Sequence, residues 1–183
     1  MKTKPTAKVI ADSINSEGDR LLTIEATMHR FVLAEFNTHR AFSRNSASSR
    51  AIPVAKQLGK IQSDPAMPVE FGTNKSGMQA AEPLTSLYAD QASYHWLKAR
   101  DAAYLASERL SSDLNVHKQV ANRMLEPWMW HTVIFSTTEL DNFFEQRCSE
   151  LAQPEIRVVA EHIRDAVNAS IADQLDDGEW HTP

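Results

Sequence analysis

The sequence contains only one cysteine, Cys148, among 183 residues. A lone cysteine cannot form an internal disulfide, and no set of Cys and His residues has the spacing of a zinc site. We therefore expect neither a disulfide framework nor a bound metal. A chain without disulfides suits a reducing compartment, so we predict a cytoplasmic protein.

The sequence also lacks a long hydrophobic run. Its uncharged apolar stretches fall far short of the roughly 18 to 20 residues that a membrane span needs. The N-terminus has no charged segment followed by an apolar one, which is the pattern that directs export. We expect an unexported protein with no membrane partner.

Positive charge is scarce, because 19 Lys and Arg residues stand against 24 Asp and Glu residues and give a net charge of -5. A general nucleic-acid binder needs a broad basic excess to neutralise phosphates, so we expect no nucleic-acid partner. With 42% hydrophobic residues, a chain of this length can bury a core without disulfides or metal ions to stabilise it. We predict that residues 1–183 form a single domain.

The hydrophobic pattern predicts an α+β fold, in which a small antiparallel or mixed sheet packs with several helices, including a long helical segment. Residues 7–15 and 21–28 are expected to form a hairpin around the turn at 16–19, and residues 128–137 a further strand. Residues 63–82 are expected to be a loop. Helical patterns cover residues 30–37, 51–61, 83–112 (one helix or a pair), 116–125 up to a boundary at Pro127, 139–148, and a last helix from Pro154 through Ile171.

One polar loop concentrates positive charge. Residues 38–50 contain three arginines, one histidine, four serines and no acid. Guanidinium groups, hydroxyls and loop amides together supply the donors that a phosphate needs. The alternative is a solvated basic loop with no specific ligand, and short basic motifs do not decide between the two.

Further candidates lie downstream at Arg123, Asn142 and Arg147. On an ideal helix Asn142 and Arg147 differ by about 140°, so they would face two ligands lying side by side rather than one point. The alternative is that Arg147 pairs with Glu145 or Glu150 at the surface while Asn142 is merely exposed. These residues alone leave both interpretations open.

Four other side chains that could carry chemistry are better explained as structural. Arg147 could lower the pKa of the neighbouring Cys148 thiol, but we expect a buried, unreactive helix cysteine. Trp96, Trp128 and Trp130 could stack on a ring, but aromatic residues at such spacings usually belong to the core.

Taken in order, these segments resemble the flavin-dependent thymidylate synthases, or thymidylate synthase complementing proteins. The family signature is Arg-His-Arg, seven residues, then Ser, and it stands here as Thr38-His39-Arg40, seven residues, then Ser48. The blocks at 122–127, 142–147 and 152–157 follow in the expected order. The similarity covers roughly residues 21 to 163, and the residues in the motifs are most similar to those of compact phage-type members.

The resemblance implies methylation of dUMP to dTMP, with methylenetetrahydrofolate as carbon donor and NADPH-reduced FAD as hydride donor. It also implies a homotetramer, in the host cytoplasm if a phage encodes it, with the basic loop and the downstream helix brought together from different chains. The implied flavin contacts are Thr38, His39, Arg40, Ser46 and Asn142. The implied substrate contacts are Glu35, Ser48, Ser49, Arg50, Arg123 and Arg147.

Two of these residues are the implied catalytic groups. Arg147 would stabilise negative charge that develops on the pyrimidine, and Ser48 is a candidate nucleophile. The sequence departs from the family at Thr38, which replaces an arginine, at Ser46, which replaces an acid, and in a few residues absent before Asn142. Because these departures lie beside the implied ligands, a hydroxymethylase, a dCMP-acting enzyme and a non-catalytic nucleotide-binding protein remain alternatives.

Overall fold

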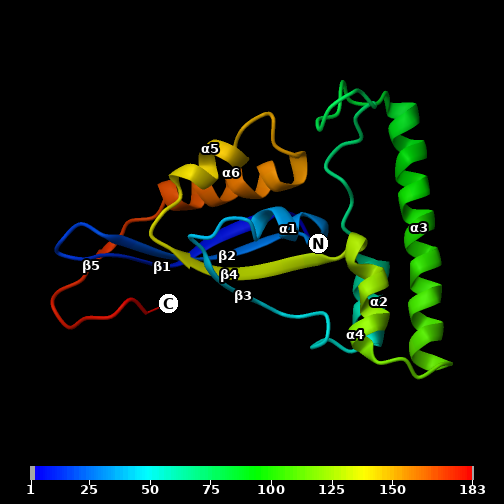
Figure 1. The fold of residues 1–183 in the computed structure, drawn as a ribbon, viewed down its shortest axis with the longest axis horizontal. Coiled ribbons are helices and arrows are strands. Elements are labelled where there is room, and N and C mark those ends of the chain that lie inside the picture. Colours follow the sequence, from blue (N-terminus) through cyan, green and yellow to red (C-terminus); the bar gives the residue numbers. More distant parts are fainter. Residues whose placement is uncertain (1–2, 183) are drawn as a thin grey trace. The chain divides into compact units, whose positions relative to one another are not determined.

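The structure is a computed structural model, which describes residues 3–182 (Figure 1). The chain divides into two compact units. The first comprises residues 29–31 and 47–130 with Thr3, and the second comprises residues 4–28, 32–46 and 131 onward. A mixed sheet and a long helix confirm the α+β class, while the single-domain expectation stays a prediction.

The second unit is built on a five-stranded sheet with the order β3-β4-β2-β1-β5. Its hairpin strands pair antiparallel, whereas β1 and β5 pair parallel. The predicted mixed sheet is therefore confirmed. The strands are β1 (Thr6–Ile14), β2 (Arg20–His29), β3 (Ser43–Ser46), β4 (Trp130–Thr137) and β5 (Asp173–Gln174).

The predicted hairpin of β1 and β2 is confirmed, and its turn shows why it forms. The side-chain oxygen of Asn15 accepts backbone hydrogen bonds from Glu17 at 3.1 Å and Asp19 at 2.7 Å. Gly18 adopts φ of 92°, a conformation that costs little without a Cβ. Alternation along β2 buries Leu22, Ile24, Ala26 and Met28.

The helices of the second unit are α1 (Leu33–Phe36), which follows the 3-10 turn η1 (Arg30–Val32), then α5 (Asp141–Arg147) and α6 (Pro154–Asn168). α6 packs on β1 and on α5, and both helices cover one face of the sheet (Figure 1). Extending α6 to Ile171 was wrong, because the helix ends at Asn168 and Ile171 is 90% exposed. The chain there turns toward β5.

Helices dominate the first unit: α2 (Val54–Ser63), α3 (Ser86–Ser112), α4 (Lys118–Ala121) and the 3-10 segment η2 (Asn122–Trp128). α3 is one uninterrupted helix of 27 residues, as the pattern of good helix formers favoured. α2 begins three positions later than expected, because Pro53 is extended at its N-cap. The hydrophobic core of the first unit consists of Val54, Leu58, Ile61, Ala121, Leu125, Trp128 and Met129.

Two boundary predictions were wrong. Pro127 does not end the helical segment, since η2 continues through Trp128, which lies in the core rather than in a strand. Residues 43–46 form strand β3 inside the predicted polar loop; all four side chains are exposed, so no burial alternation marks the strand.

Residues 64–85 are a loop, as predicted, with an isolated bridge between Gly72 and Pro83. Within residues 3–182, no helix is both long enough and apolar enough to cross a membrane.

Candidate functional site

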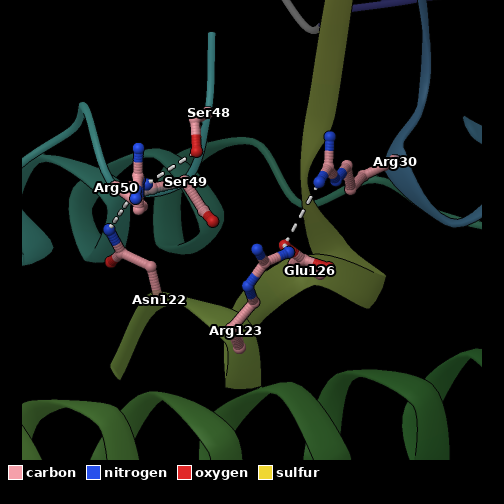
Figure 2. Close-up of polar contacts among 7 residues, drawn as sticks. All are labelled: Arg30, Ser48, Ser49, Arg50, Asn122, Arg123 and Glu126. Atoms are coloured by element: carbon pink, nitrogen blue, oxygen red, sulfur yellow. Dashed lines mark hydrogen bonds and ion pairs between the residues drawn. The ribbon is translucent and has the colours of Figure 1, made fainter. Parts of the chain in front are cut away.

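Most of the residues implied by the resemblance gather in two clusters, one in each unit. The first cluster lies in the first unit, where Ser48, Ser49 and Arg50 form a turn ahead of α2 (Figure 2). Ser48 Oγ accepts the backbone N–H of Arg50 at 3.3 Å, and its carbonyl accepts that of Ala51 at 2.9 Å. The turn leaves the side chains of Ser48 and Arg50 exposed and that of Ser49 buried.

Asn122 holds this turn against η2. It is fully buried, and its amide nitrogen donates to the carbonyl oxygens of Ser49 at 2.8 Å and Ile52 at 2.9 Å. Its own Oδ1 and the Oγ of Ser49 are buried without a hydrogen-bond partner. Buried polar atoms are nearly always paired, so these two atoms mark a place where a polar ligand would be accommodated.

Next to Asn122, two arginines converge on one carboxylate. Glu126 Oε1 lies 2.8 Å from Arg123 Nη1 and 3.3 Å from Arg30 Nη2 (Figure 2). The side chains are unequally exposed, at 56% for Arg123, 25% for Glu126 and 14% for Arg30. The cluster thus combines guanidinium groups, serine hydroxyls and a single acid, which is a composition suited to an anion.

Arg147 is the centre of the second cluster, in the second unit. Its Nε donates to His39 Nε2 at 2.9 Å, and its Nη2 donates to Thr38 Oγ1 at 3.2 Å. The surface pairing with Glu145 or Glu150 is therefore not the contact that the described chain makes. Thr38 and His39, at the start of the basic loop, thus contact helix α5 within one chain, while the expectation that different chains bring the loop and the helix together stays a prediction.

His39 is buried against the ring of Phe143, with 4.8 Å between centroids in an edge-on arrangement. Because its Nε2 accepts a hydrogen bond from Arg147, the ring is neutral and carries its proton on Nδ1. Burial, reinforced by the charges of Arg147 and Arg44, lowers the pKa of His39 below its usual 6.5.

The lowered pKa of His39 predicts a specific pH dependence of stability. The unfolded chain takes up this proton near pH 6.5 while the folded chain resists it, so the free energy of unfolding should fall as pH drops below 6.5 and be independent of His39 above it. Urea unfolding across this range would test it, with His39→Gln as reference because an amide oxygen can also accept from Arg147. Identical pH profiles for the two proteins would contradict the prediction.

Glu35 and the other polar residues of the basic loop differ in their surroundings. Arg44 donates to the carbonyl oxygens of His39 and Phe42 at 3.0 Å, so it braces the loop from within. Arg40, by contrast, is exposed and makes no ion pair among residues 3–182. Ser46 is also exposed, and Glu35 has a buried Oε2 without a partner.

Asn142 and Arg147 diverge on α5. Asn142 is exposed and accepts a hydrogen bond from Gln146 at 2.9 Å, whereas Arg147 turns inward to His39. Cys148 is half-buried at the C-cap of α5 rather than fully buried within the helix, and its partial burial raises the pKa of the thiol, which disfavours the reactive thiolate. Within the described part of the chain, no three His, Cys, Asp or Glu side chains form a group that could hold a metal.

Sequence reasoning missed Asn122, Glu126 and Arg30 as members of the first cluster. Arg30 and Glu126 are 96 positions apart, and Asn122 lies 73 positions from Ser49, so no local pattern links them. One signal was available for Asn122 and Glu126, because both belong to the family block at residues 122–127.

The clusters place guanidinium groups and hydroxyls, which are suited to an anion, on an α+β scaffold. The family model of the thymidylate synthase complementing proteins matches residues 21–171, and the chain belongs to this family. No protein of curated function matches it significantly in sequence.

Solved structures show the same fold. One is a UMP/dUMP methylase, PolB from Streptomyces cacaoi, bound with 5-Br UMP: 15% identity, a TM-score of 0.72, and coverage of 91% of this chain and 89% of that one. The same enzyme bound with 5-Br dUMP gives 14% identity and a TM-score of 0.65, with 91% of each chain covered.

Proposed function

We propose that this protein is a flavin-dependent thymidylate synthase, which transfers a one-carbon unit from methylenetetrahydrofolate to C5 of dUMP and yields dTMP. Membership of the thymidylate synthase complementing family supports the reaction class. The observation that supports the assignment to this chain is the first cluster, which joins two segments of the family pattern. There the side-chain amide of Asn122 donates a hydrogen bond to the backbone carbonyl of Ser49. We also propose a homotetramer in the cytoplasm.

The nucleotide phosphate is assigned to the first cluster. Arg50 and Arg123 present exposed guanidinium groups, and the hydroxyls of Ser48 and Ser49 supply further donors. Ser48 Oγ has the Arg50 backbone as its partner and, within residues 3–182, no histidine or carboxylate in position to deprotonate it. We therefore assign Ser48 to phosphate binding rather than to nucleophilic attack.

The pyrimidine is assigned to Arg147. Its partners are a neutral imidazole and a hydroxyl, with no carboxylate among them, so its full positive charge is available. Such a charge would stabilise the negative charge that develops on a pyrimidine carbonyl when C5 attacks the carbon donor. Held at Nε by His39, the guanidinium needs no reorganisation during that step. Glu35, whose carbonyl lies 3.5 Å from Arg147 Nη2, belongs to the same neighbourhood.

The residues of the second cluster also fit FAD. Arg40 offers an exposed guanidinium that makes no ion pair within residues 3–182 and is suited to a pyrophosphate, and the other implied contacts are polar. We propose that Thr38, His39, Arg40, Ser46 and Asn142 hold the flavin. When bound and reduced by NADPH, the flavin supplies the hydride.

A second candidate is a related reaction on the same class of substrate. Thr38 stands where the family has an arginine, and its hydroxyl is committed to Glu35 O at 2.7 Å and to Arg147. A change at this position alters the surroundings of Arg147 and would affect which pyrimidine is accepted or whether the product is methylated or hydroxymethylated. The structural neighbours are methylases of UMP as well as dUMP, so UMP is a further substrate to examine.

Mass spectrometry of the nucleotide product tests the proposal. The protein is incubated with methylenetetrahydrofolate, FAD and NADPH, and with dUMP, UMP or dCMP in parallel reactions. We expect a methylated product from dUMP that requires all the added components. A hydroxymethylated product would select the second candidate. Tight dUMP binding without any product would show a non-catalytic nucleotide-binding protein and contradict the proposal.

A further inference from the structure

Glu126 places a negatively charged carboxylate in the cluster that we assign to phosphate binding. Its carboxylate is the acid that pairs with both Arg30 and Arg123, and it takes up the position on Arg123 Nη1 that an anionic ligand would use. A carboxylate and a phosphate oxygen compete for the same guanidinium donors. The arrangement in Figure 2 therefore already contains an anion of its own.

We propose that Glu126 is an internal competitor for Arg123, which the nucleotide phosphate displaces on binding and which returns to Arg123 on release. This inference rests on the proposed function in taking the ligand to be a nucleotide phosphate. Glu126 thereby lowers the affinity for the nucleotide and speeds its dissociation. It does not orient Arg123 for the ligand.

The two arginines differ in a way that permits such an exchange. Arg30 lies at the junction of β2 and η1, its backbone N–H donates to Met129 O at 2.8 Å, and its side chain is mostly buried. Arg123 is the more exposed partner, and a long exposed side chain reorients at little cost. Arg30 can keep Glu126 in place while Arg123 turns to the phosphate, so the half-buried carboxylate never loses both arginine partners.

Charge determines how different ligands respond to Glu126. Near pH 7 a phosphomonoester carries close to two negative charges, because its second pKa is about 6, whereas a phosphodiester carries one. The carboxylate repels the dianion more strongly than the monoanion. Removing its charge should therefore strengthen dUMP binding more than binding of the methyl phosphodiester of dUMP, an inequality that a purely structural change would not produce.

Calorimetry on the full chain with Glu126→Gln tests the exchange. The amide is isosteric and its oxygen can still accept from Arg30, so thermal unfolding should stay close to that of the wild type. We expect dUMP to bind about fivefold more tightly to Glu126→Gln and to dissociate more slowly. A change of about fivefold in Kd corresponds to the loss of one part-exposed ion pair. The gain for the methyl phosphodiester should be smaller. The matched control Asp113→Asn removes the same charge at the end of α3 and should change neither affinity.

A double-mutant cycle and a second probe make the outcome decisive. In an Arg123→Gln background, the gain from Glu126→Gln should shrink, because no guanidinium remains to be released and only the repulsion between the carboxylate and the phosphate is relieved. Inorganic phosphate is measured in parallel. If neither protein binds dUMP but Glu126→Gln gains affinity for phosphate, the nucleotide assignment fails and the exchange stands. If Glu126→Gln bound dUMP and inorganic phosphate no more tightly than the wild type, the exchange would be overturned. Glu126 would then be a residue that positions Arg123.

Discussion

Replacing Arg147 with alanine is expected to lower the rate of dTMP formation by about 100- to 1,000-fold, the range for removing one group that stabilises transition-state charge. In the structure, His39 and Thr38 hold the guanidinium without neutralising it. Its charge would thus be preorganised for the pyrimidine. The measurement is a steady-state assay of dTMP formation at saturating dUMP and folate, together with urea unfolding of the same preparations.

The matched variant Arg147→Lys separates charge from geometry. Lysine keeps the positive charge but has no planar fork and no Nε–H to donate to His39. An intermediate rate would show that both the charge and the hydrogen bond to His39 contribute. If Arg147→Ala retained near-normal turnover while its unfolding free energy fell, Arg147 would be a structural link between α5 and the loop, and its assignment to the pyrimidine would be wrong.

The sequence predicted the elements whose signals are local. The hairpin of β1 and β2 has a turn motif between alternating strands, α3 has an uninterrupted run of good helix formers, and α6 has long apolar periodicity. Strand β3 has neither signal, because its four side chains are all exposed and it exists through backbone pairing with β4. The two-residue strand β5 is likewise defined by its pairing with β1 alone. Such strands depend on tertiary context, which a single sequence does not display.

The candidate site divides in the same way. Residue types and motif order predicted Ser48, Ser49, Arg50 and Arg123 of the first cluster and Arg147 of the second. The partners that organise them could not be predicted, because the contact from Arg147 to His39 spans 108 positions and that from Asn122 to Ser49 spans 73. The helical-wheel argument did anticipate that Asn142 and Arg147 diverge, since it uses only local geometry.

The short helix α5, which carries Arg147, depends on tertiary packing. It has seven residues, fewer than an isolated helix needs to be stable, and Leu140 at its N-cap supplies no side-chain hydrogen bond. Phe143 is its buried anchor, 2% exposed, with ring centroids 5.9 Å from Phe36 and 5.1 Å from Phe42. Its ring also meets His39, so one side chain supports both the helix and the partner of Arg147.

Replacing Phe143 with alanine should therefore reduce the free energy of unfolding by about 3 to 5 kcal/mol, the cost of removing a large buried aromatic side chain. Because the cavity would lie under His39, turnover should fall even where the variant is still folded, through looser placement of Arg147. Urea unfolding gives the first quantity. The dTMP assay, at a temperature where circular dichroism shows native helix content, gives the second.

The neighbouring variant Phe144→Ala is the matched control, since Phe144 is on the same helix, only partly buried, and has its ring contact with Phe143 alone among the described aromatic residues. It should cost less stability and leave turnover near that of the wild type. Equal losses of turnover in both variants would mean that α5 responds to any loss of packing. A loss confined to Phe143→Ala would instead connect the aromatic core, through His39, to the guanidinium of Arg147.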